Sequence, residues 1–255
     1  MPDVDALLVV EEVAKSFGGV HAVDGASFRV PRGSLTGMIG PNGAGKSTVL
    51  SMIAGAVAPD RGSIRLDGQE IAGLPSPKTA RRGVIRTFQN ASVFPHMTVL
   101  ENLLLGVPPW SGETVAAALF RRHRWHREEA QQVSQARNLL ERLGISGMAD
   151  TFAGQLSGGQ KRLVEIGRAM MSRPKLLLLD EPMAGVSRTL APVIEALIAD
   201  LRNEGMTVVL IEHELALVER LCSPVVVLAQ GRVLMQGEMQ EARANPEVRK
   251  AYLVG

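Results

Sequence analysis

Eight consecutive residues, Gly40 to Ser47, have the types and the spacing needed to bind phosphate groups. They fit the pattern G-x-x-x-x-G-K-[ST] and lie between a predicted strand and a predicted helix. The glycines allow consecutive backbone N–H groups to turn toward one anion at a helix N-terminus. Lys46 can then reach the β- and γ-phosphates, and the Ser47 hydroxyl can bind Mg²⁺. The segment predicts a nucleoside triphosphate site, the alternative being a glycine-rich turn that ends in Lys-Ser by chance.

Two carboxylates and a histidine follow two further predicted strands. Asp180 and Glu181 come directly after the apolar run 176–179, and His213 follows shortly after the run 207–211. Because α/β sheets bind ligands at the carboxyl ends of their parallel strands, we expect these side chains beside the phosphate loop. Asp180 would hold Mg²⁺, Glu181 would act as general base for water, and His213 would contact the γ-phosphate. Buried carboxylates are costly without a metal or partner, which disfavours a purely structural pair. For His213 the alternative is a histidine that only packs.

A second glycine pair precedes another predicted helix. Residues 156–160 read Leu-Ser-Gly-Gly-Gln and stand before a helix predicted over 161–172. Two adjacent glycines after a serine make a further helix N-terminus suited to phosphate. Two such cradles in one chain suggest that one ATP is held between two subunits.

The elements that must position these residues alternate between strands and helices. Strand–helix–strand alternation implies right-handed crossovers and a parallel sheet, so an α/β fold is expected, with a helical block inserted between its halves. The prediction is one domain over 1–255, with a catalytic core at about 1–95 and 174–255 and a helical subdomain at about 96–173. Strands are predicted over 6–10, 26–30, 34–39, 63–66, 176–179, 207–211 and 225–228, and helices over 47–54, 190–201 and 247–253.

Composition excludes several classes of protein. With 28 Lys and Arg against 26 Asp and Glu, the net charge of +2 is too weak to indicate nucleic-acid binding. The single cysteine, Cys222, excludes a disulfide framework and a cysteine zinc cluster, and points to a reducing compartment. The apolar run 52–58 is far shorter than the roughly 18 residues of a membrane span, and the acidic start lacks a signal-peptide pattern. We therefore expect a cytoplasmic chain that does not itself span a membrane.

Taken in order, these motifs resemble those of the ATP-binding-cassette (ABC) ATPases, and the resemblance covers nearly the whole chain. It implies a P-loop NTPase core with a mostly parallel sheet, an N-terminal antiparallel β subdomain and an inserted α-helical subdomain. It also implies that Phe17 stacks on adenine, that Gln89 senses Mg²⁺ and water, and that Ser157 and Gly159 contact the γ-phosphate held by the opposing subunit.

The resemblance completes the set of expected site residues. The catalytic residues are Glu181, His213 and Gln89, and the Mg²⁺ ligands are Ser47, Gln89 and Asp180. The residues expected to bind ATP are Phe17, Gly40, Pro41, Asn42, Gly43, Ala44, Gly45, Lys46, Ser47, Thr48, Ser157, Gly158, Gly159 and Gln160. One position departs from the family pattern, because Ser187 stands where the loop after Glu181 usually carries an aspartate.

Within the family, the segments 84–90, 94–103 and 251–255 resemble the ATPase subunits of branched-chain amino-acid importers. The implied partners are a second ABC ATPase subunit, identical or not, transmembrane permease subunits and, indirectly, a substrate-binding protein, at the cytoplasmic face of the inner membrane. Urea importers and lipopolysaccharide exporters are the near alternatives. A soluble ABC ATPase acting on nucleic acid is disfavoured, since such proteins usually carry two cassettes or a long coiled coil. The basic cluster 121–127 could follow phosphates or lie near anionic lipid.

Overall fold

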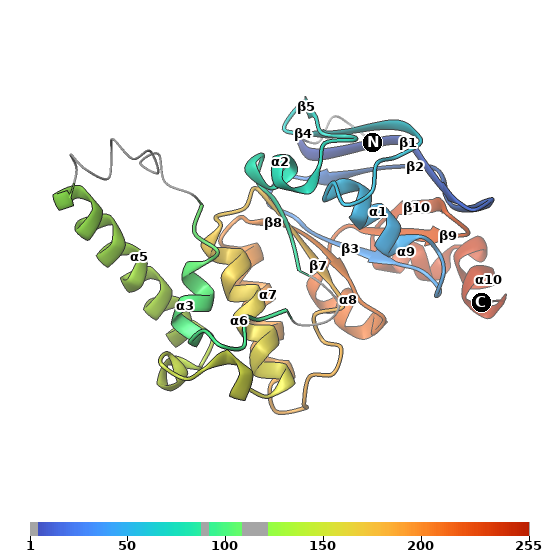
Figure 1. Cartoon of the computed structure of the whole chain (residues 1–255). Helices are drawn as coiled ribbons and strands as arrows, with labels where there is room; N and C mark the ends of the chain where they lie inside the picture. Colours follow the sequence, from blue (N-terminus) through green and yellow to red (C-terminus); the bar gives the residue numbers. More distant parts are fainter. Residues whose placement is uncertain (1–4, 88–91, 109–121, 255) are drawn as a thin grey trace. The chain divides into compact units, whose positions relative to one another are not determined.

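The computed structural model divides into two units, each built from segments that are distant in the sequence (Figure 1). It describes residues 5–87, 92–108 and 122–254. The first unit contains Met1–Gln89, Pro174–Pro182 and Ile198–Gly255, and the second contains Asn90–Arg173 and Met183–Leu197. The phosphate loop and both strand-end carboxylates belong to the first unit, and the second glycine pair belongs to the second.

A six-stranded sheet forms the centre of the first unit, in the order β10-β9-β3-β8-β7-β6. All neighbouring strands are parallel except β10, which pairs with β9 in the antiparallel sense. Four inner strands are buried along their whole length, as expected for parallel strands covered on both faces. The predicted α/β fold with a mostly parallel sheet is thus confirmed. The strands are β3 (Leu35–Ile39), β6 (Val84–Arg86), β7 (Leu176–Asp180), β8 (Thr207–Ile211), β9 (Val225–Ala229) and β10 (Arg232–Gly237).

An antiparallel sheet at the N-terminal end has the order β2-β1-β4-β5. Its strands are β1 (Ala6–Phe17), β2 (Val20–Pro31), β4 (Arg61–Leu66) and β5 (Gln69–Glu70). The predicted strands 6–10 and 26–30 are only the ends of a long hairpin, so their predicted lengths were wrong. Pairing continues past the polar residues that interrupt the apolar pattern, through register shifts around Glu12, whose φ is +49°. Gly18 and Gly19, with φ of +51° and +87°, form the turn of this hairpin.

Helix α1 (Lys46–Ile53) lies between the two sheets (Figure 1) and follows directly from the phosphate loop. Its side chains Val49, Leu50 and Ile53 are buried in one apolar cluster with residues of both sheets. Helix α8 (Leu215–Leu221) packs against β3, where a Cβ on Gly37 would collide with Val218. The phosphate loop therefore joins β3, which α8 supports, to α1, which is buried between the sheets, so that both of its ends are fixed.

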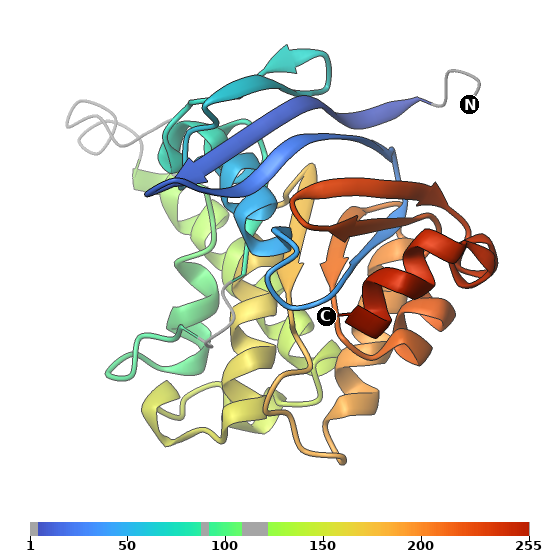
Figure 2. The ribbon, with the colours of Figure 1, turned by 90° about the vertical axis from the view of Figure 1, so that its right-hand side faces the viewer.

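The remaining helices of the first unit are α2 (Ser76–Arg81), α9 (Met239–Ala244) and α10 (Pro246–Val254). Figure 2 shows α9 and α10, in dark red, beside the β9–β10 hairpin. Of these, only the last was predicted. The carboxyl-terminal helix therefore lies on the same sheet edge as the hairpin.

The second unit is helical, as the sequence predicts for the inserted block. It contains α3 (Val99–Leu104), α5 (Arg122–Arg142), α6 (Gly158–Met171) and the short 3₁₀ helices Ser146–Met148 and Ala153–Gln155. Leu139 and Leu140 of α5, Leu143 directly after it, and Leu163 and Ile166 of α6 are buried. The boundary between the units falls within α7 (Ala191–Asn203), which begins one residue after the predicted position, Leu190. In the part of the chain that the structure describes, no helix is long and apolar enough to cross a membrane.

Cys222 lies buried just after α8, and burial raises the pKa of its thiol from 9.0 to about 12. With that pKa, the thiolate at pH 8 is about a thousandfold less abundant than in an ordinary cysteine. We therefore expect alkylation of the native protein by iodoacetamide to be at least about a hundredfold slower than alkylation of the protein in guanidinium. Equal rates, measured by mass spectrometry, would contradict the buried, unreactive thiol.

Candidate functional site

The phosphate loop connects the end of β3 to the start of α1 through glycines that no other residue could replace without strain. Gly40, Gly43 and Gly45 have φ of +152°, +78° and +100°. A Cβ on Gly40 would collide with the Leu228 carbonyl oxygen, and a Cβ on Gly45 would lie 2.5 Å from the Ala22 carbonyl oxygen. No side chain caps the first turn of α1. Its backbone N–H groups are therefore available to an anion.

Lys46 extends back beneath this loop. Its Nζ donates hydrogen bonds to the carbonyl oxygens of Gly40 at 2.7 Å and Pro41 at 3.0 Å, and the residue is only 7% exposed. Burial lowers the pKa of Lys46, while the charges of Glu181 and Asp180 act in the opposite direction. The ammonium is thus held at the loop with two carboxylates near enough to influence it.

Glu181 and His213 meet where two neighbouring parallel strands end. β7 and β8 pair with Asp180 opposite Ile211, and the Glu181 N–H donates to the Ile211 carbonyl oxygen. Beyond that point Glu181 Oε1 lies 2.8 Å from His213 Nε2. The backbone of Glu181 has a φ of +49°, a left-handed conformation that is rare outside glycine and is often found at functional sites. Both side chains thus follow the ends of adjacent strands, as expected, whereas the role of Glu181 as general base and the contact of His213 with the γ-phosphate remain predictions.

Asp180 is buried at the end of β7 and forms an ion pair that the sequence motifs do not indicate. Arg86 of β6 donates through Nη2 to Asp180 Oδ2 at 2.8 Å and through Nη1 to Ser51 Oγ at 2.8 Å. Ser51 in turn donates to the Ser47 carbonyl oxygen at 2.6 Å. No local sequence signal reveals this link, because it joins residues from two strands and a helix.

The donor set fits a magnesium ion bound together with phosphates. Ser47 is exposed at the start of α1, and Asp180 supplies a carboxylate at the adjacent strand end. Mg²⁺ prefers oxygen ligands and is usually held by one or two protein groups together with substrate phosphates and water. The third predicted ligand, Gln89, lies outside the described residues.

In the second unit, Ser157 is the N-cap of α6. Its Oγ accepts a hydrogen bond from the Gln160 N–H at 3.3 Å, and the Gln160 Oε1 accepts one from the Ser157 N–H at 2.9 Å. This capping box could have been read from the Ser-x-x-Gln spacing. A Cβ on Gly158 would meet nothing within 4 Å, whereas one on Gly159 would collide with Leu190. The loop is therefore rigid, with its serine and first glycine exposed.

The two other residues that the family pattern singles out are both placed. Phe17 ends β1 and is 49% exposed, with Lys15 Nζ 5.6 Å from its ring centre, so the ring is accessible for stacking. Ser187, at the position that departs from the family, pairs its hydroxyl with Thr189 at 2.9 Å within its own loop. The basic cluster 121–127 has no described side chains.

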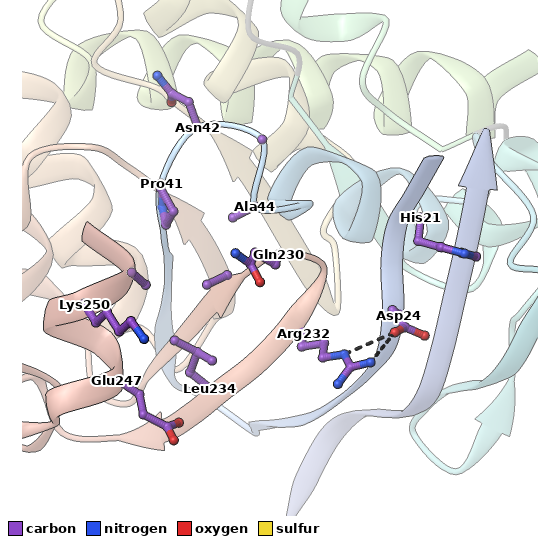
Figure 3. Close-up of a pocket in the computed structure, with 13 residues that line it drawn as sticks. His21, Asp24, Pro41, Asn42, Ala44, Gln230, Arg232, Leu234, Glu247 and Lys250 are labelled. Carbon is purple, nitrogen blue, oxygen red and sulfur yellow. Dashed lines mark hydrogen bonds and ion pairs between the residues drawn. The ribbon is translucent and has the colours of Figure 1, made fainter. Parts of the chain in front are cut away.

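A cavity of about 790 Å³ opens beside the phosphate loop (Figure 3). Residues 41–44 of the loop line one side, and β2, the β9–β10 hairpin and α10 supply the rest. Figure 3 shows Arg232 facing Asp24, to which it donates two hydrogen bonds of 3.1 and 2.6 Å. Elsewhere on α10, burial raises the pKa of Tyr252, while a hydrogen bond from the Gly40 backbone opposes that rise. Neither Phe17 nor Lys46 is among the described residues that line the cavity. Most of its wall is therefore formed by residues outside the sequence motifs.

Comparison with known proteins agrees with this geometry. Residues 23–184 match the model of the ABC transporter family. The chain is 44% identical over 97% of both chains to BraF of Pseudomonas aeruginosa, described as a high-affinity branched-chain amino acid transport ATP-binding protein. It is 37% identical, with the same coverage, to the corresponding LivG protein of Escherichia coli.

Solved structures show the same relationship. The ADP conformation of an ATP-binding cassette of an ABC transporter superposes with a TM-score of 0.81 at 36% identity, covering 97% of this chain and 98% of that one. A nucleotide-free cassette gives a TM-score of 0.80 at 36% identity, with the same coverage. The chain therefore belongs to the ABC transporter family, as an ATP-binding ATPase subunit.

Proposed function

We propose that this chain hydrolyses ATP to drive the import of branched-chain amino acids. The observation that carries the proposal is the 44% identity to BraF over 97% of both chains. The relatives from Escherichia coli and Methanocaldococcus jannaschii, at 37% and 38% identity, are also described as branched-chain amino acid transport ATP-binding proteins. Three relatives from different organisms, all named for branched-chain amino acid transport, favour this substrate class over urea or lipopolysaccharide.

In the proposed reaction, residues of the first unit have separate roles in binding and in catalysis. The N–H groups of the loop and Lys46 bind the phosphates, and Phe17 stacks on the base. Mg²⁺ would be held by Ser47, Asp180 and Gln89. Its charge would neutralise the negative charge that develops on the phosphates during hydrolysis. Glu181 takes the proton from the attacking water, and His213 holds the Glu181 carboxylate by the 2.8 Å contact. Since a carboxylate only accepts hydrogen bonds, His213 Nε2 carries the proton of that contact.

The partners follow from what the chain contains. The glycine pair at the start of α6 is a second phosphate-binding surface, which we assign to ATP held by another cassette. Two cassettes closing head to tail over two ATP molecules would then transmit force to permease subunits at the cytoplasmic face of the membrane, with a substrate-binding protein delivering the amino acid. Nucleic acid is not expected as a partner.

Ser157→Arg tests the second phosphate-binding surface. An arginine at this exposed N-cap would place a bulky charge in the interface between cassettes, so ATP-dependent dimerisation should weaken by at least about tenfold. ATP binding by the monomer should change little. Ser146→Arg, in an exposed 3₁₀ helix of the same unit, is the matched control. Sedimentation with ATP in a Glu181→Gln background measures both. Undiminished dimerisation of Ser157→Arg would argue against the shared site.

Transport assays test the substrate. The chain would be co-purified with its membrane partners, reconstituted in vesicles and supplied with the binding protein. Leucine, isoleucine or valine should raise ATP hydrolysis and accumulate, whereas Lys46→Ala complexes should do neither. Stimulation by urea, or by DNA or RNA in a salt-sensitive manner, in place of branched-chain amino acids would refute the proposed substrate.

A further inference from the structure

Arg86 connects the two sides of the predicted metal site. Its Nη2 donates to Asp180 Oδ2 and its Nη1 to Ser51 Oγ, both at 2.8 Å. The Ser51 hydroxyl in turn donates a hydrogen bond to the carbonyl oxygen of Ser47. A hydroxyl both donates and accepts, so this chain of contacts is chemically consistent. Asp180 and Ser47 are the two described residues proposed to bind Mg²⁺, and one guanidinium links them.

The surroundings make the Arg86 charge effective. The side chain of Asp180 is 4% exposed and that of Arg86 is 13% exposed, so water screens the pair little. Arg86 Nε is buried and has no hydrogen-bond partner among the described residues, so two contacts alone fix the guanidinium. A planar group with donors on two edges can span a carboxylate and a hydroxyl at once, which a lysine ammonium does less well.

We propose that Arg86 is a positioning residue of the nucleotide site, which neutralises Asp180 and thereby sets how strongly Mg²⁺ and ATP favour each other's binding. The inference rests on the proposed role of Asp180 as a metal ligand. Near the loop, the cations Lys46 and Arg86 offset part of the negative charge of Asp180 and Glu181. Without Arg86 the local charge becomes more negative, so binding of ATP without metal is weakened, whereas the Mg²⁺ complex brings positive charge of its own.

The sign of the effect follows from binding linkage. Coupling between Mg²⁺ and ATP is the ratio of the ATP dissociation constants measured without and with Mg²⁺, and it is reciprocal between the two ligands. Loss of Arg86 weakens metal-free binding more than metal-bound binding, so the ratio rises. A residue that merely supported the fold would weaken both by the same factor.

The experiment uses the full chain and the non-hydrolysable analogue AMP-PNP, with calorimetry in EDTA and in saturating Mg²⁺. Arg86→Gln should raise the coupling ratio about tenfold, the size expected for one unit charge acting across several ångströms of a partly buried site. Arg86→Lys, which keeps the charge, should remain within about threefold of wild type. Arg82→Gln is the matched control, because Arg82 is exposed and donates to Gln69 on the surface.

Ser51→Ala gives a second test that does not remove a buried charge. It deletes the acceptor of Arg86 Nη1 and should raise the ratio by about two- to threefold, because the guanidinium is held less firmly on Asp180. Equal losses in both conditions for Arg86→Gln, or an unchanged ratio in both variants, would overturn the inference. If the wild-type protein bound AMP-PNP equally with and without Mg²⁺, the proposed metal site would be wrong and the inference would fall with it. Transport of a different solute would leave the inference unaffected.

Discussion

Glu181→Gln is expected to lower the rate of ATP hydrolysis by about 10²- to 10⁴-fold, the usual contribution of a general base. The amide keeps the size of the side chain and can still pair with His213, but it cannot accept a proton from water. ATP binding should stay within about threefold of wild type, because Lys46 and the loop amides are untouched. Hydrolysis is measured by phosphate release and binding by calorimetry.

A trapped intermediate should accompany that loss. With binding intact and turnover blocked, the variant should accumulate as an ATP-bound dimer that sedimentation detects. Glu129→Gln, at an exposed position of α5, is the matched control and should behave as wild type. Turnover by Glu181→Gln at a rate near that of wild type would refute the assignment of the base. His213→Ala should give a smaller loss, since it leaves the base in place but removes the contact at Oε1.

The parts of the site that could be predicted depend on local sequence or on strand ends. The loop from 40 to 47 needs only its glycines, its lysine and the adjoining strand and helix, all of which a short segment encodes. Glu181 and His213 lie together because β7 and β8 are parallel neighbours, and the carboxyl ends of such strands meet at one sheet edge. Placement at a strand end was therefore predictable, although the direct contact between the two side chains was not.

The parts that could not be predicted depend on contacts between distant segments. The Arg86 pair with Asp180 requires knowing that β6 is the neighbour of β7 and that Arg86 is paired with Leu178. Similarly, α10 lies near the phosphate loop because it packs beside the β9–β10 hairpin (Figure 2). The sequence around Tyr252 therefore does not predict that this residue lies close to Gly40. The long hairpin was underestimated because half-exposed antiparallel strands tolerate charged residues and bulges that end an apolar pattern.

Lys46→Ala is expected to weaken ATP binding by about 10²- to 10⁴-fold. Hydrogen bonds to a charged group contribute about 1.5–3 kcal/mol each, and the ammonium serves two phosphates. Lys78→Ala, an exposed lysine of α2, is the matched control and should bind ATP as wild type does. Titration calorimetry with AMP-PNP and Mg²⁺ measures the difference, and unchanged affinity in Lys46→Ala would refute the phosphate role of the loop lysine.

The loss should reflect missing charge rather than a collapsed loop. Lys46 ties the carbonyl oxygens of Gly40 and Pro41 together, but the loop path is also fixed by Gly40 against Leu228 and by Gly45 against Ala22. Burial lowers the pKa of Lys46, which means that its charge is costly to bury. Lys46→Ala removes this cost together with the two hydrogen bonds, so the free energy of unfolding should fall by no more than about 1–2 kcal/mol. Lys46→Arg separates the two effects, since it keeps the charge but cannot fit the same buried position beneath the loop. Because the ammonium must occupy that position to reach the phosphates, Lys46→Arg should recover less than a tenth of the lost affinity, although its net charge equals that of wild type.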